Sequence, residues 1–128
     1  KTLEPIRKML SDLRRRNGVV VYSDIVDRAN AAFRKLNKFR HSPPDFDAVE
    51  QVDQLRQMTA ITVYWYEQCL VNASKSLAQD PEFKRLMDDS LYSLSRIWVA
   101  IANKAEPNLI SLLRGLRSSD RLLFLRFG

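Results

Sequence analysis

Apolar side chains recur at three- and four-residue steps over residues 80–105, which is the spacing of one face of an α-helix. Asp80 can accept a hydrogen bond from an amide of the first turn, and Pro81 has a preset φ that suits the first helical position. Pro107 disfavours the helical conformation at Glu106. The sequence therefore predicts a helix from Asp80 to Ala105. Its inward residues are Phe83, Leu86, Met87, Leu91, Leu94, Ile97, Trp98, Ile101 and Ala105.

A second long helix is predicted from Asp45 or Asp47 to about Gln79, after the break at Pro43-Pro44. Its middle is apolar around nearly the whole circumference, which is typical of a central helix. Because only a short turn joins it to the next helix, we expect the two to pack antiparallel as the core hairpin. Trp98→Ala should then cost on the order of 3–5 kcal/mol if the indole is buried.

Three further helices complete the predicted fold. They run from Leu3 to about Arg16, from Ser23 to about Arg40, and from Pro107 onward, with Ser118-Ser119-Asp120 capping a separate final turn through Leu125. Residues 19–22 are β-branched or aromatic but have no second segment to pair with, so we interpret them as buried linker or as the first turn of the next helix. The sequence predicts an all-α helical bundle of four to six helices in a single domain, 1–128. We interpret this domain as part of a longer protein, since the chain starts at Lys1 and ends in apolar and basic residues.

Charge is unevenly distributed along the chain, whose net charge is +6. Residues 1–41 hold eleven Lys/Arg against four Asp/Glu, residues 42–106 hold six against ten, and residues 107–128 hold four against one. Basic ends around an acidic middle favour a polyanion-binding surface, with an ordinary solvated surface as the alternative interpretation. The candidate nucleic-acid-binding residues are Arg14, Arg15, Arg16, Arg34, Lys35, Lys38 and Arg40, with a second patch at Arg114, Arg117 and Arg121.

No pattern of an enzyme or a metal site is recognisable, so we expect no catalytic residue, no metal and no cofactor. One Cys and one His cannot form a zinc cluster, and Cys69 fits a buried apolar position. Asp88 and Asp89 are adjacent and point about 100° apart on a helix, which prevents them from sharing a proton. Uninterrupted apolar runs are far shorter than the roughly 20 residues of a membrane span, so no membrane contact is expected.

One alternative is catalytic. Arg34 and His41 have the spacing of the R-x4–6-H motif of HEPN ribonucleases, which are also small helical bundles. In such a site the His would transfer protons and the Arg would stabilise phosphate charge. Lys35 replaces the small polar residue expected after the Arg, and the simpler interpretation is a solvent-facing His41 before a proline turn.

The segment from Cys69 through the helix at 80–105 to the leucine-rich residues 109–113 resembles the core of the nucleolus and neural progenitor protein family. That family is related to the small RNase MRP-specific protein subunit of fungi. Glu82-Phe83, the run Leu94-Ser95-Arg96-Ile97-Trp98-Val99 and the segment Val21-Tyr22-Ser23 carry the resemblance. Residues 23–28 differ from the family's Asn/His/Arg-rich segment at that place.

The resemblance implies a non-catalytic helical scaffold of a nucleolar ribonucleoprotein that processes ribosomal RNA precursors, with RNA and other protein subunits as partners. The alternative is a protein-interaction adaptor. Residues 33–40 are similar to a basic stretch in helical adaptor domains of transcription elongation factors and integrase-binding chromatin proteins. In that case the basic helix would bind acidic linear peptides.

Overall fold

Helices make up nearly all of the chain that the structure describes. The computed structural model describes residues 5–6 and 22–127, and it contains no strand within those residues. The helices are α2 (Tyr22–His41), α3 (Val49–Asn72), α4 (Lys75–Gln79), α5 (Pro81–Ala102) and α6 (Glu106–Phe127). The prediction of an all-α bundle is confirmed. The helix predicted over residues 3–16 lies outside the described residues, apart from residues 5 and 6.

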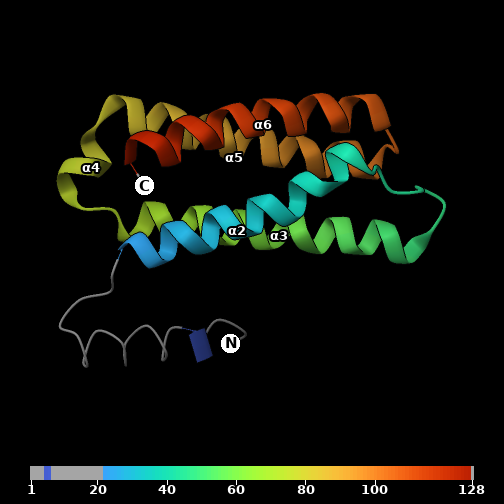
Figure 1. Ribbon diagram of the computed structural model, residues 1–128, viewed down its shortest axis with the longest axis horizontal. Helices are drawn as coiled ribbons and strands as arrows, with labels where there is room; N and C mark the ends of the chain where they lie inside the picture. The colour runs from blue at the N-terminus through green and yellow to red at the C-terminus, as the bar shows by residue number, and fades with distance from the viewer. Residues whose placement is uncertain (1–4, 7–21, 128) are drawn as a thin grey trace.

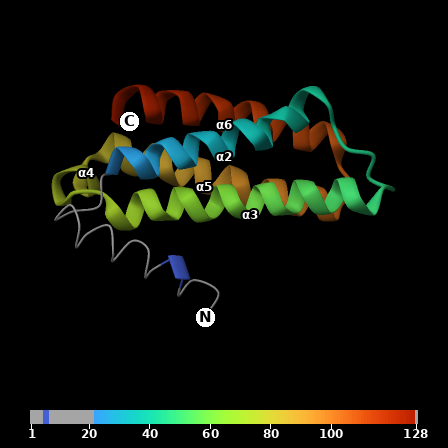
Figure 2. The same ribbon diagram turned by 60° about the horizontal axis from the view of Figure 1, so that its bottom comes forward.

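The four long helices form a ring in which each neighbour runs in the opposite direction (Figure 1, Figure 2). α2 packs against α3, α3 against α5, α5 against α6, and α6 against α2, while α3 and α6 occupy opposite corners. This is an up-down-up-down bundle. α3 and α5 form the predicted antiparallel hairpin, although α5 packs most extensively on α6, and α2 on α3.

α5 begins where the sequence predicts, because its first turn is chemically well defined. The Asp80 carboxylate accepts hydrogen bonds from the backbone N–H groups of Glu82 at 2.9 Å and Phe83 at 3.1 Å, and Pro81 is the first helical residue. The helix ends at Ala102, before the predicted Ala105, because the chain turns through a left-handed residue. Lys104 has a φ of 53°, which allows the amide of Ala105 to bond the Ala100 carbonyl at 2.9 Å.

The prediction of one unbroken helix from residue 45 or 47 to residue 79 is wrong at both ends. Residues 45–48 form a turn, in which the Asp45 carboxylate accepts from the amide of Asp47 at 2.9 Å. α3 ends at Asn72, and Ala73 is extended. Ser74 then accepts a hydrogen bond from the amide of Leu77 at 3.2 Å and starts the separate helix α4. The serine hydroxyl competes with the helix by offering the backbone this alternative bond.

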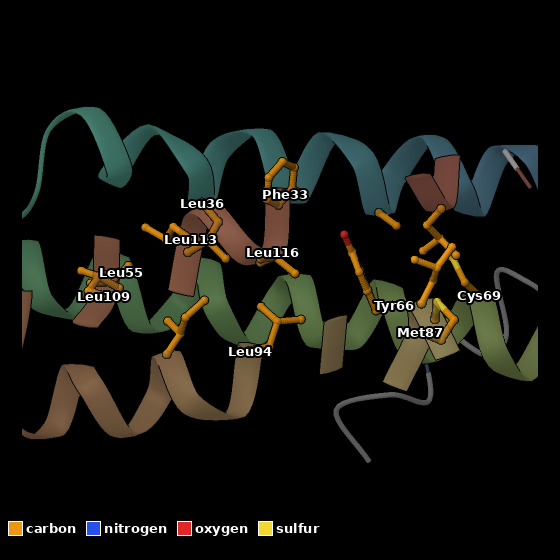
Figure 3. Close-up of a cluster of buried hydrophobic side chains, with 14 of the residues drawn as sticks. Phe33, Leu36, Leu55, Tyr66, Cys69, Met87, Leu94, Leu109, Leu113 and Leu116 are labelled. Carbon is orange, nitrogen blue, oxygen red and sulfur yellow. The ribbon is translucent and has the colours of Figure 1, made fainter. Parts of the chain in front are cut away.

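The core consists of one continuous cluster of buried side chains from α2, α3, α5 and α6 (Figure 3). Leu94, Leu113 and Tyr66 are fully buried, and Cys69 is buried as predicted. Trp98 is 47% exposed, so the expected loss of 3–5 kcal/mol on its truncation does not apply. Within α5 its neighbours Ile97 and Ile101 take the inward positions, which leaves the indole at the edge of the apolar face.

Candidate nucleic-acid interface

The positive charge of the described residues is concentrated on two neighbouring helices. α2 and α6 together carry nine Lys/Arg against four Asp/Glu. α3 and α5, on the other side of the ring, carry four against six. Because α2 and α6 are in contact, residues far apart in sequence share one basic surface. A polyanion approaching this side meets a net attraction that the opposite side does not offer.

The electrostatic interaction between Arg34 and Asp120 shows which sides of α2 and α6 face each other. Arg34 on α2 lies close enough to Asp120 on α6 for its positive charge to lower the pKa of that carboxyl. Lys38 follows Arg34 by one turn on α2, and Arg117 and Arg121 flank Asp120 on α6. We call the exposed set the α2/α6 basic face, and it comprises Arg34, Lys38, Arg114, Arg117 and Arg121.

Other predicted binding residues lie elsewhere. Lys35 is exposed but shares the side of α2 that carries Arg28, whose guanidinium stacks 5.4 Å from the centre of the Trp65 ring on α3. Arg40 is half-buried and bonds to its own helix, donating to Asn37 Oδ1 at 3.3 Å. Arg14, Arg15 and Arg16 lie outside the described residues.

The catalytic alternative at Arg34 and His41 receives no support from the local geometry. His41 is exposed, and its Nε2 accepts a hydrogen bond from Arg40 Nη2 at 2.9 Å. Arg34 is seven residues earlier, roughly 10 Å along the helix axis, and lies beside Asp120 instead. The described residues contain no group of three or more His, Cys, Asp or Glu that could hold a metal ion.

A buried polar pair lies directly beneath the α2/α6 basic face. The Tyr66 hydroxyl donates a hydrogen bond to Asp120 Oδ1, and the Tyr66 ring packs edge-on against Phe124 with 6.1 Å between ring centroids. Asp120 is only 5% exposed. Burial raises its pKa to about 7, against the opposing effects of the Tyr66 hydrogen bond and the Arg34 charge. Burial, and then the Asp120 charge, raise the pKa of the Cys69 thiol to about 12, which keeps the thiol protonated at neutral pH.

The predicted cap at Ser118-Ser119-Asp120 is therefore wrong. α6 continues without a break to Phe127, and Asp120 faces the core rather than a helix terminus. The physical reason is that the Asp120 carboxylate accepts its hydrogen bond from the Tyr66 hydroxyl, and not from a backbone N–H group as it would in a helix cap. The sequence does contain a signal for this position, because Leu113, Leu116, Asp120 and Leu123 recur at the helical spacing of the core.

Comparison of the chain with protein-family models, with curated proteins and with solved structures finds no match. Among the described helices, none is both long and apolar enough to cross a bilayer.

Proposed function

We propose that this bundle is a non-catalytic RNA-binding scaffold, a subunit of a nuclear or nucleolar ribonucleoprotein that takes part in RNA processing. The observation that supports the proposal is the α2/α6 basic face, formed by two helices from opposite ends of the described chain. Lysine and arginine contacts to phosphates supply most of the sequence-independent affinity of nucleic-acid-binding proteins. The resemblance of residues 82–83 and 94–99 to the nucleolus and neural progenitor protein family supports the nucleolar assignment.

The composition of the face favours RNA over the alternative partner, an acidic peptide. Helical adaptors bind such peptides through apolar anchors as well as charge. α2 exposes no large hydrophobic side chain, and α6 exposes them only at Leu122 and Leu125, beyond Arg121. The face between Arg114 and Arg121 is therefore suited to phosphate contacts and offers little surface for a buried anchor.

Two variants with the same change in net charge test the proposal. The first replaces four cations of the face with glutamine: Arg34, Lys38, Arg117 and Arg121. The second replaces four exposed cations outside α2 and α6: Arg56, Lys75, Lys84 and Lys104. Circular dichroism confirms that each variant folds, and fluorescence anisotropy measures its affinity for a structured RNA hairpin.

We expect the first variant to lose at least about tenfold in RNA affinity and the second to stay within about twofold of the unmodified protein. Equal losses in both variants would mean that bulk charge, not the α2/α6 basic face, attracts RNA, and would overturn the proposal. Competition with poly-glutamate separates the two partner classes. If poly-glutamate displaces the RNA at an equal concentration of negative charges, the result would favour the alternative function, an adaptor that binds acidic peptides.

A further inference from the structure

An acidic residue lies under the α2/α6 basic face. Asp120 lies between Arg117 and Arg121 in the sequence of α6, but it is buried, whereas both arginines are exposed. The Tyr66 side chain reaches from α3 into the bundle interior (Figure 3), where its hydroxyl donates a hydrogen bond to Asp120 Oδ1. A polyanion on the face would therefore not touch this carboxyl, but it would lie within reach of its charge.

The groups that act on the Asp120 carboxyl come from the neighbouring helices. α2 contributes Arg34, which is exposed and whose positive charge lowers the pKa of Asp120. α3 contributes the Tyr66 hydroxyl and the Cys69 thiol, whose own pKa is raised by the Asp120 charge. α5 packs most extensively on α6, but none of its buried side chains is ionisable. On α6 itself the adjacent charges are the two exposed arginines. Arg34 is thus the cation of the face through which α2 and the buried carboxyl interact.

Asp120 is the member of this cluster that changes charge near neutral pH. Burial is the main cause that raises the pKa of Tyr66 well above its ordinary value and that of Cys69 to about 12, so both groups keep their protons. Arginine stays charged under all these conditions. Burial of Asp120 disfavours its ionised form and raises its pKa to about 7. The cluster therefore gains one negative charge as the pH rises through neutrality.

The two protonation states of Asp120 present different surfaces to a polyanion. When the carboxyl is neutral, it exerts no attraction on the Arg34 guanidinium, and the cations of the face act outward. When the carboxyl is ionised, it attracts Arg34 toward the interior and cancels part of the positive potential of the face. Salt screens a buried charge much less than an exposed one, so this effect is not removed by physiological salt.

We propose that Asp120 is a pH-dependent regulator of the α2/α6 basic face: its neutral form permits tight binding of phosphate groups at Arg34, and its ionised form weakens that binding by competing for the same guanidinium. This inference rests on the proposed function, because it concerns regulation of the same surface. By linkage, a bound polyanion favours the neutral carboxyl in return, so binding near neutral pH takes up protons. The affinity for RNA should therefore fall as the pH rises through the titration of Asp120.

The affinity for the structured RNA hairpin is measured by fluorescence anisotropy from pH 6 to 8.5 at constant salt concentration. All proteins carry His41→Gln, since histidine side chains change charge in the same range. In this parent protein we expect the affinity to fall at least about threefold between pH 6 and 8.5. Asp120→Asn should keep the tight binding throughout. Asp27→Asn, which removes an exposed carboxylate of α2, should retain the pH dependence of the parent.

Two further measurements do not require Asp120→Asn to fold. Tyr66→Phe removes a hydrogen bond that lowers the pKa of Asp120, so the midpoint of the pH profile should move to higher pH. Calorimetric titration in two buffers of different ionisation enthalpy should show net proton uptake when the parent protein binds RNA at pH 7. Circular dichroism at each pH confirms that every protein compared is folded.

The proposal is overturned if the parent protein binds RNA equally well at pH 6 and 8.5, or if Asp120→Asn keeps the pH dependence of the parent. A midpoint that Tyr66→Phe leaves unchanged, or binding without proton uptake at pH 7, would also overturn it. In each of these cases RNA still binds, so the proposed function stands. Absence of RNA binding at every pH would overturn the proposed function together with this inference.

Discussion

Tyr66 on α3 donates a hydrogen bond to Asp120 on α6, and this pair joins two helices at opposite corners of the bundle. Both side chains are buried, and the Arg34 charge acts on the same carboxyl from α2. A buried polar pair is costly unless both partners are satisfied, so it favours the one packing arrangement that brings them together. We infer that this pair helps to fix which faces of α3 and α6 point inward, and therefore which side of α6 displays Arg117 and Arg121.

Removal of the Tyr66 hydroxyl should destabilise the protein at neutral pH. Tyr66→Phe retains the ring that packs on Phe124 but leaves the Asp120 carboxyl without that donor. The expected loss is about 1–3 kcal/mol in the free energy of unfolding, measured by urea titration. The same substitution in an Asp120→Ala background should cost clearly less, because no buried carboxyl remains to be satisfied. Equal costs in the two backgrounds would show that the hydrogen bond does not couple these residues.

The raised pKa of Asp120 predicts a specific pH dependence of stability. The carboxyl titrates near 7 in the folded protein and near its ordinary value of 3.8 in the unfolded chain. Between these two pH values the folded state therefore binds more protons than the unfolded chain. The contribution of Asp120 to the free energy of unfolding is greatest below pH 3.8 and falls as the pH rises toward 7. The slope for one full proton is about 1.4 kcal/mol per pH unit.

Asp120→Asn isolates that contribution because the asparagine cannot ionise. The stability of the variant relative to the unmodified protein should rise from pH 4 to about 7 and then level off, as measured by urea unfolding at each pH. Glu82 has a pKa lowered by its hydrogen bond to Arg85, but this effect is the same in both proteins and cancels in the difference. A difference that stays constant over this range would contradict the burial of an ionisable Asp120.

Truncation should affect two positions of α5 very differently. Leu94 is fully buried, so Leu94→Ala is expected to cost about 2–5 kcal/mol. Trp98 is half exposed, and Trp98→Ala should cost less than about 2 kcal/mol despite removing the larger side chain. Thermal and urea unfolding of the two variants give the comparison. A cost for Trp98→Ala equal to that of Leu94→Ala would mean that the indole is buried in solution.

Gly115 is a position where the bundle can be stabilised. It lies inside α6 and is exposed, and an added Cβ would meet no atom within 4 Å apart from its chain neighbours and the backbone of its own helix. Gly115→Ala should therefore raise the free energy of unfolding by roughly 0.5–1 kcal/mol, because alanine loses less backbone entropy in a helix. An increase in the melting temperature checks this, and a decrease would indicate that α6 is not a continuous helix at this residue.

Local chemistry decided how well each element could be predicted. α5 has a strong cap at Asp80 and a proline at the next position, so its start followed directly from the sequence. The end of α3 could not be predicted in this way, because alanine and serine also occur inside helices. Only the hydrogen bond from the Leu77 amide to the Ser74 hydroxyl, seen in the structure, marks the break. The sequence analysis placed Asp120 in the cap of a separate final turn, because its partner Tyr66 lies 54 residues away and could be found only in the fold.

The candidate binding surface was predicted in part. The sequence identified the basic residues of α2 and α6 but placed Lys35 and Arg34 in one group, although they lie on different sides of α2. Which side faces α6 depends on the contact between these two helices. Helical periodicity defines a face relative to its own axis and does not identify the neighbouring helix.

The salt dependence of RNA binding tests the central claim most directly, because the slope of log K against log salt counts the phosphate contacts that are lost. The slope is measured between 50 and 200 mM salt for the unmodified protein and for the variant with glutamine at Arg34, Lys38, Arg117 and Arg121. We predict a slope that is shallower by about 3 to 4 in the variant, at roughly 0.7 to 0.9 for each of the contacts removed. Identical slopes in the two proteins would contradict the assignment of the α2/α6 basic face as the RNA-binding surface.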